Sequence, residues 1–331
     1  MKHKDCIKLS GTLIVGLLVL PAIAGKPWQF RPTQVSKAPF FNAPKYGLEI
    51  EGRPAGWLSS AEGGHDTSEK VNQKQISDPQ FEDLGVKCGA GMSSEFYQWL
   101  ADTCANKHTR KSGAIVAADF NYREMTRLTF KDALITEVGL PALDAASKDT
   151  AKMTIKFAPE YTRFAASSGG GPSIGGWPDT DADIQKKWQC SNFRLRISGL
   201  NQPCSRVNKI DSFVVKQKVI RRPPAGQVRD YQKEPSAIET PNLVITFPEN
   251  SSREFSDWHK DFVIQGHNGL DKEKEGTLEY LAPDLKGVLF TVSFHGLRIL
   301  KMSPDNIGSG GQVNRQIKCE MFCRSISFKK V

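Results

Sequence analysis

Histidine and cysteine are the residues of this chain whose types and spacing could do chemistry. Cys104 and His108 are four residues apart near the end of a predicted helix, a spacing that suits a thiol nucleophile and its base. Cys319 and Cys323, also four apart, could provide half of a zinc site. An orienting acid with an oxyanion site is not evident for the first pair, and a second close ligand pair is not evident for the other. The sequence therefore predicts no catalytic residue, no bound metal and no enzyme.

Other candidate ligand segments have simpler interpretations. Gly169–Gly176 is rich in glycine, but no Lys-Ser/Thr pair follows it, so we interpret it as a linker and not as a nucleotide-binding loop. Asp179, Asp181 and Asp183 alternate along the chain and could bind Ca²⁺ weakly. They lack the glycine and the terminal glutamate of an EF-hand loop. We therefore expect no cofactor.

Six cysteines follow the N-terminal segment that contains Cys6, and an even number in an exported protein allows a disulfide framework. If residues 317–328 form one strand, Cys319 and Cys323 are ~13 Å apart, too far for a disulfide without a bend or a helix. Buried free thiols are the alternative for all six, because a domain of this size does not need disulfides. The candidate disulfide cysteines are Cys88, Cys104, Cys190, Cys204, Cys319 and Cys323.

Residues 1–24 have the pattern of a signal peptide. A basic start precedes the apolar stretch Gly11–Leu20, which is too short to span a bilayer comfortably. Ala22-Ile23-Ala24 then places small residues before a cleavage point at Gly25. We expect an exported protein of the periplasm, cell envelope or extracellular space, with no membrane span after cleavage; an uncleaved anchor is the alternative.

Composition favours a globular protein with a mildly basic surface. The net charge is +9, but the basic residues are spread along the chain, without an arginine-rich block with interleaved aromatics. We therefore expect no specific nucleic-acid partner. At 331 residues, two domains are the natural expectation. Beyond the signal peptide, the segments are an extended arm rich in Pro and Lys (25–44), domain 1 (45–164), a linker rich in Gly, Pro and Asp (165–189) and domain 2 (190–331).

The two predicted domains carry the same marks in the same order. Tyr46–Gly52 corresponds to Phe193–Gly199, and Glu95–Trp99 to Glu254–Trp258. Such an internal repeat places two similar surfaces in one chain, which suits ring building better than enclosing one active site. Further matches are Lys111–Ile115 with Lys274–Leu278, Phe130–Leu134 with Phe294–Leu297, and Lys152–Phe157 with Lys318–Phe322.

Each domain is expected to have one helix and otherwise strands. Ser93 or Ser94 caps the first helix, whose apolar face includes Trp99. For the second helix, Ser251 and Glu254 predict a capping box, and Gly266 is placed to end it. Its apolar stripe is Phe255, Trp258 and Phe262. The predicted strands are Ala114–Ala118, Arg127–Leu134 and Met153–Phe157 in domain 1, and Leu278–Leu281, Val288–Phe294 and Ile317–Phe328 in domain 2.

With these motifs, the chain resembles the tail-tube protein family of contractile phages and phage-tail-like injection machines. The resemblance covers about 41–163 and 192–328 and is carried by Phe96–Leu100, Arg110–Gly113, Pro141–Lys148, Asp257–Lys260 and Glu320–Cys323. It implies a mainly β fold, with two tandem tail-tube-like β-barrel or β-sandwich domains, each with one flanking α-helix. It also implies edge-to-edge association into hexameric rings that stack into a tube, so three chains with two copies each could form one ring.

The resulting hypothesis is a non-enzymatic structural protein that is exported and self-assembles into a ring or tubule. Its main partner is itself, as a trimer or hexamer, and other tail-like or envelope components are further candidates. Tail-tube proteins normally lack export signals, so a secreted tubule fits better than part of a virion. The alternative is an exported binding module that recognises a host surface or polysaccharide. In this family, loops such as Pro141–Lys148 contribute to subunit contacts, and the candidate contact residues are Pro141, Leu143, Asp144, Ser147 and Lys148.

Overall fold

The computed structural model describes residues 45–67, 70–72, 75–76, 80–167, 171–174, 177, 188–222, 232–305 and 315–330. The predicted signal peptide and arm lie outside these residues, as do Asp179, Asp181 and Asp183. Within the described ranges, no helix combines the length and the apolar character that crossing a membrane requires.

The first half of the chain contains one helix, α1 (Ser94–Cys104), one long strand, β9, and otherwise shorter strands. Its strands are β1 (Lys45–Ile50), β2 (Arg53–Gly63), β3 (Asp66–Thr67), β4 (Lys70–Asn72), β5 (Gln75–Ile76), β6 (Gln80–Phe81), β7 (Leu84–Cys88), β8 (Lys111–Ala118), β9 (Glu124–Leu140), β10 (Leu143–Asp144), β11 (Met153–Ala158) and β12 (Tyr161–Ala166).

The second half has the same mixture, with the long strand β19 and the helix α4. Its strands are β13 (Phe193–Ile197), β14 (Lys209–Ile210), β15 (Phe213–Arg222), β16 (Gln232–Glu239), β17 (Leu243–Pro248), β18 (Lys274–Leu281), β19 (Val288–Asp305), β20 (Gln316–Phe322) and β21 (Ser325–Lys330). Its helices are α3 (Asn201–Cys204), the 3-10 helix η1 (Glu249–Ser251), α4 (Arg253–His259), the π-helix η2 (Lys260–Ile264) and the 3-10 helix η3 (Leu270–Lys272).

Six strands of the first half close into a barrel. They follow one another in the order β11-β7-β2-β1-β8-β9, and β9 returns to pair with β11. All of these pairings are antiparallel. β9 is 17 residues long and serves two sets of neighbours. Its first part pairs with β8 and β12, and its last part with β11 and β15.

The second sheet has the order β10-β14-β17-β20-β19-β18-β13, with β21 added on β19. Its long strand, β19, has 18 residues. The first part of β19 pairs with β18 and β21, as β9 does with β8 and β12, and its last part pairs with β20. The predicted single strand 317–328 is therefore wrong in one respect: Cys323 and Arg324 separate β20 from β21, and the two strands pair with different parts of β19.

Both long strands carry a β-bulge at a matching place. In the ladder between β9 and β11, Thr136 has no partner, and Glu137 beyond it lies opposite Lys156. In the ladder between β19 and β20, Leu300 has no partner, and Lys301 beyond it lies opposite Glu320. A bulge bends a strand and increases its twist, so each long strand can change neighbours midway along its length.

The predicted first helix is confirmed. Ser93 is its N-cap, and the Ser93 hydroxyl accepts a hydrogen bond from the Phe96 N–H at 3.3 Å. Phe96, Trp99 and Leu100 are buried on one face, as their spacing predicts. A cap of this kind satisfies one of the N–H groups that the first turn leaves without a partner.

The predicted capping box of the second helix is wrong. Ser252 is the N-cap of α4 and makes no side-chain capping bond. The preceding 3-10 helix η1 takes up Ser251, whose hydroxyl bonds to the Asn250 side chain at 3.2 Å. The other predictions for this helix are confirmed: its aromatic stripe is buried, and Gly266 (φ 74°) follows its end.

The core runs through both halves and is rich in aromatic side chains. Trp188, at the end of the predicted linker, is fully buried and contacts the rings of Tyr280 and Phe290 with centroids 5.5 and 5.3 Å away. Trp177 is also buried, against the outer face of β1 and β8 with Trp57. The prediction of a mainly β fold with two barrel-like sheets and flanking helices is confirmed; the second half adds α3 and the short turns around α4.

Candidate assembly interface

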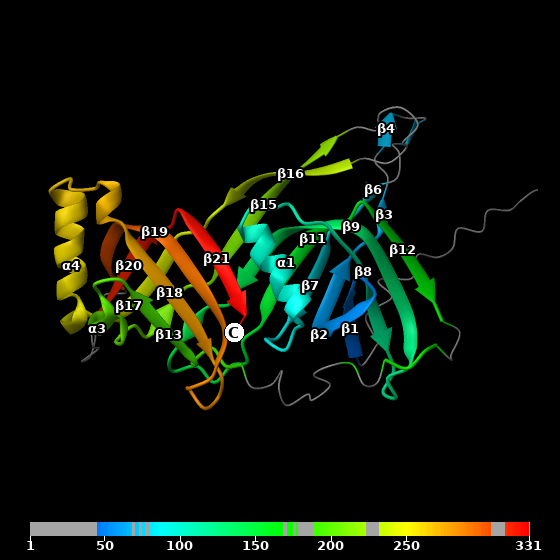
Figure 1. The fold of residues 1–331 in the computed structure, drawn as a ribbon, viewed down its shortest axis with the longest axis horizontal. Helices are drawn as coiled ribbons and strands as arrows, with labels where there is room; N and C mark the ends of the chain where they lie inside the picture. The colour runs from blue at the N-terminus through cyan, green and yellow to red at the C-terminus, as the bar shows by residue number, and fades with distance from the viewer. Residues whose placement is uncertain are drawn as a thin grey trace, which may run out of the picture. The chain divides into compact units, whose positions relative to one another are not determined.

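β15 connects the two halves, because it follows β14 of the second sheet and then pairs with β9 in the barrel (Figure 1). Val138 and Leu140 of β9 are buried along this contact, as are Phe213 and Val215 of β15. The pairing therefore satisfies main-chain groups and removes apolar side chains from water. Its register places Phe213 opposite Leu140, Val214 opposite Gly139, Val215 opposite Val138 and Lys216 opposite Glu137.

A buried lysine holds β16, the strand beyond β15, against the barrel. Lys233 is 5% exposed, and its Nζ donates to the Phe81 carbonyl at 3.1 Å and lies 3.4 Å from the Asp83 carboxylate. Its main-chain N–H donates to Glu160 at 3.3 Å. Burial lowers the pKa of Lys233, and the attraction of Asp83 opposes that effect. Lys233 thus links a strand of the second half to three residues of the first.

β15 and β16 form an antiparallel hairpin, and Lys233→Glu should detach this hairpin from the barrel. The substitution places a carboxylate beside Asp83 and Glu160 at a position that is only 5% exposed, so we expect a loss of about 3 kcal/mol in the free energy of unfolding. Lys233→Met, which keeps the volume without the charge, should cost less than Lys233→Glu, because it leaves the Phe81 carbonyl without a donor but adds no like charge. Urea unfolding measures both changes, and proteolysis of 213–239 should accelerate in the glutamate variant alone. Equal effects of the two substitutions would show that the charge at this position does not matter.

Residues that follow α1 contact the same hairpin. The Arg110 guanidinium donates to the Lys233 carbonyl and forms an ion pair with Glu160. Nδ1 of His108 lies 3.1 Å from the side-chain nitrogen Nε2 of Gln217, a buried residue of β15. His108 thus takes part in the contact between the halves. Burial raises the pKa of the Cys104 thiol to about 12, which makes this cysteine a poor nucleophile at neutral pH.

The predicted contact segment Pro141–Lys148 also lies between the two halves. Leu143 is buried opposite Ile210, where β10 pairs with β14 of the second sheet. The Asp144 carboxylate is 3.3 Å from Nζ of Lys209. Ser147 bonds to Asp149 at 3.1 Å inside its own turn. Pro141 is partly buried and Lys148 is exposed.

A third contact is made by α1 and β21, which lie side by side (Figure 1). Nζ of Lys330 donates to the Met92 carbonyl at 2.6 Å and lies 5.2 Å from the Tyr97 ring. The Tyr97 ring also packs against Phe290, with centroids 5.7 Å apart. The two halves are therefore joined by strand pairing, ion pairs and aromatic packing within one chain.

Residues 57–163 match the family described as the T4-like virus tail tube protein gp19. The resemblance to tail-tube proteins is therefore confirmed for this part of the chain. The tail-tube match includes the accepting strand β9 and the segment Pro141–Lys148, whereas β15 and β16 lie outside it.

Solved structures give partial likenesses of low identity. Hcp1 from Flavobacterium johnsoniae is 14% identical, and the alignment covers 37% of this chain and 96% of Hcp1 with a TM-score of 0.30. The anti-feeding prophage cap is 14% identical over 40% of this chain and 93% of its own, with a TM-score of 0.33. A further Hcp protein is 10% identical over 38% and 93%, with a TM-score of 0.30. No curated protein matches the chain.

A charged hollow of about 440 Å³ lies on the outer face where β15 meets the tail-tube segment. Four of its seven ionic side chains form two ion pairs with each other. Lys156 is 3.0 Å from Glu137, and Lys218 is 2.6 Å from Glu239. The hollow is lined by Glu62, Asp83, Gly85, Thr136, Glu137, Lys156, Lys216, Gln217, Lys218 and Glu239.

The six candidate disulfide cysteines are buried free thiols in this structure. Burial raises the pKa of Cys88, Cys104, Cys204 and Cys319 to about 12 each. Cys323 follows the end of β20, and its thiol donates to the Ser325 carbonyl at 3.0 Å. Pairing of these cysteines on oxidation stays a prediction.

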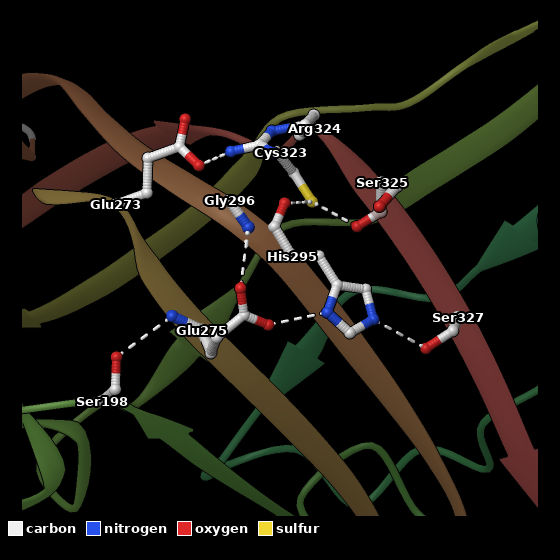
Figure 2. A network of polar contacts seen from close by, with 9 residues as sticks. All are labelled: Ser198, Glu273, Glu275, His295, Gly296, Cys323, Arg324, Ser325 and Ser327. Atoms are coloured by element: carbon white, nitrogen blue, oxygen red, sulfur yellow. Dashed lines mark hydrogen bonds and ion pairs between the residues drawn. The ribbon is translucent and has the colours of Figure 1, made fainter. Parts of the chain in front are cut away.

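Sequence reasoning missed one polar network, which joins three neighbouring strands of the second sheet (Figure 2). Nδ1 of His295 is 2.7 Å from the Glu275 carboxylate, and its Nε2 is 3.0 Å from the Ser327 hydroxyl. The hydrogen bonds thus link a carboxylate to a histidine and the histidine to a serine, as in the acid–base–nucleophile triad of serine hydrolases. Next to it, the nearly buried Glu273 carboxylate forms ion pairs with Arg298 and Arg324.

The surroundings of Ser327 favour a structural role for this network. Glu275 is bound by the Gly296 N–H as well, and its own N–H donates to the Ser198 hydroxyl at 3.0 Å (Figure 2). The side chain of Glu275 is 63% exposed to solvent and that of His295 is 45% exposed. Among the described residues, neither the hollow of about 440 Å³ nor one of about 230 Å³ in the second sheet is lined by any of the three triad-like residues. A hydrolytic site needs a substrate cleft and donors for an oxyanion, so these bonds are better explained as cross-strand ties.

Proposed function

We propose that this chain is a non-enzymatic structural subunit that assembles into a ring or tubule. The observation that carries the proposal is the pairing of β15 with β9. It joins the tail-tube segment to the second half of the chain through a strand edge, which is the kind of contact that can repeat from chain to chain. A head-to-tail contact between unlike surfaces gives a closed ring when its rotation closes.

In this proposal each half of the chain occupies one ring position. The matching bulges of β9 and β19 and the matching neighbours of the two strands support a tandem repeat of the tail-tube unit. Three chains then fill six positions, and Pro141–Lys148 provides one of the contacts between positions. The N-terminal sequence pattern supports export, so the assembly would form in the periplasm, the envelope or outside the cell.

The oligomeric state of the purified full chain tests the proposal. Sedimentation or native mass measurement should give a particle of three chains, and negative-stain images should show rings with a central hole. A uniform population of single chains would contradict assembly. If such single chains bound polysaccharide or a host surface, the alternative of a binding module would replace the ring.

A further inference from the structure

The last part of β19 has an edge without a partner strand. Among the described residues, Lys301–Pro304 pair with β20 on one side only. The corresponding part of β9 pairs with β11 on one side and with β15 on the other. An unpaired row of main-chain groups at a sheet edge is a template for a further strand.

The two bulges fix which residues correspond. Counting from the bulge, Glu137 takes the place of Lys301, Val138 that of Met302 and Gly139 that of Ser303. A smaller hollow of about 230 Å³ lies beside Lys301 and Ser303. It corresponds in position to the hollow beside Glu137 in the first half. The edge of β19 that corresponds to the β15-binding edge of β9 is therefore Lys301–Ser303, and Pro304, which has no N–H, ends it.

The strand that would fit this edge is identified by the same comparison. β2 pairs with β7 with Ala61 opposite Val86, and β14 pairs with β17 with Ile210 opposite Ile245. Beyond Ile210 the chain continues into β15, which pairs with β16; beyond Ala61 it continues into β3, which pairs with β6. Gly63 and Gly64, with φ of 80° and 79°, turn this hairpin out of line with β2.

We propose that the edge Lys301–Ser303 of β19 accepts the segment at His65–Asp66 of a second copy of this chain. Counting from the two ladders, His65 takes the place of Val214, so it lies opposite Ser303 as Val214 lies opposite Gly139. The contact between chains then repeats the contact inside each chain. This inference rests on the proposed ring function and specifies which surfaces meet in it.

Cysteine cross-linking of the full chain tests this contact. The variant His65→Cys with Ser303→Cys should link chains to one another on mild oxidation, giving a ladder on a non-reducing gel that stops at three chains. The matched control is Gly139→Cys with Val214→Cys, which should link within one chain and leave the mass unchanged. A Cβ at Gly139 would lie 3.7 Å from the Val214 side chain, so this pair is close enough. The native thiols are buried and should react slowly.

The outcomes separate this inference from the proposed function. Links between chains in the His65–Ser303 variant alone support the proposed contact. Ring particles whose control pair links while the His65–Ser303 pair does not would overturn this contact and leave ring assembly intact. Single chains that form only the control link would overturn both the contact and the ring.

Discussion

Raising the pH from 8 to 10 under reducing conditions should lower the free energy of unfolding by about 5 kcal/mol. Four thiols, those of Cys88, Cys104, Cys204 and Cys319, have their pKa raised from 9.0 to about 12 by burial. The folded chain keeps these protons at pH 10, whereas the unfolded chain releases them. Stability is therefore fully present below pH 9 and is lost as the pH rises towards 12. At pH 10, each thiol accounts for about 1.4 kcal/mol.

Urea unfolding at pH 8, 9 and 10 measures this fall. Lys233 acts in the opposite direction, because its lowered pKa makes the folded state gain stability as the pH rises towards 10.5. Lys274, whose pKa burial also lowers, acts in the same way as Lys233. Burial raises the pKa of four further groups, which add to the fall, so the fall should dominate: Cys190, Cys323, Tyr97 and Tyr280. The matched variant Cys88→Ala should show a fall smaller by about 1.4 kcal/mol, whatever its starting stability. A fall of the same size in both proteins would mean that Cys88 is not buried as a thiol.

Trp99→Ala should cost about 3–5 kcal/mol of stability through the cavity it leaves. Trp99 is 1% exposed on α1, and its ring lies 5.6 Å from that of Phe157. Its indole N–H also donates to the Thr109 carbonyl at 2.9 Å. The substitution therefore removes a large buried side chain and leaves a carbonyl without its donor.

Trp258→Ala in α4 is the matched substitution. Trp258 is 7% exposed, and its buried indole nitrogen has no hydrogen-bond partner. The substitution should also lower the free energy of unfolding by about 3–5 kcal/mol. The decrease should be about 1 kcal/mol smaller than for Trp99→Ala, because the Trp258 indole makes no hydrogen bond that would be lost. Thermal melts of the two variants give the comparison. An unchanged melt for either variant would remove that tryptophan from the core.

Local patterns predicted the helices better than they predicted how strands pair. Ser93 and the apolar spacing after it act within a single turn, so α1 could be read from the sequence. The pattern at Ser251 and Glu254 is equally local, but it does not show that Ser251 belongs to the preceding 3-10 helix η1 and so cannot cap α4. Trp188 shows the limit of composition, since the Gly and Asp around it suggest a linker although its ring is buried.

The candidate interface could be predicted only in part, because its contacts join distant segments. Pro141–Lys148 was expected to contact other subunits, which stays a prediction; within the chain it pairs with β14, more than sixty residues away. β15 was not predicted from the sequence, and a local pattern does not show that a strand leaves its own sheet to pair with β9. His295 and Ser327 are likewise 32 residues apart and meet only because β19 and β21 are neighbours.

The most direct test of the central claim is the mass of the intact particle formed by the purified chain, measured by native mass spectrometry at low micromolar concentration. We predict a particle of three chains, in which two halves per chain complete six positions. A single chain at every concentration would contradict the proposal that the strand edges of this protein build a ring.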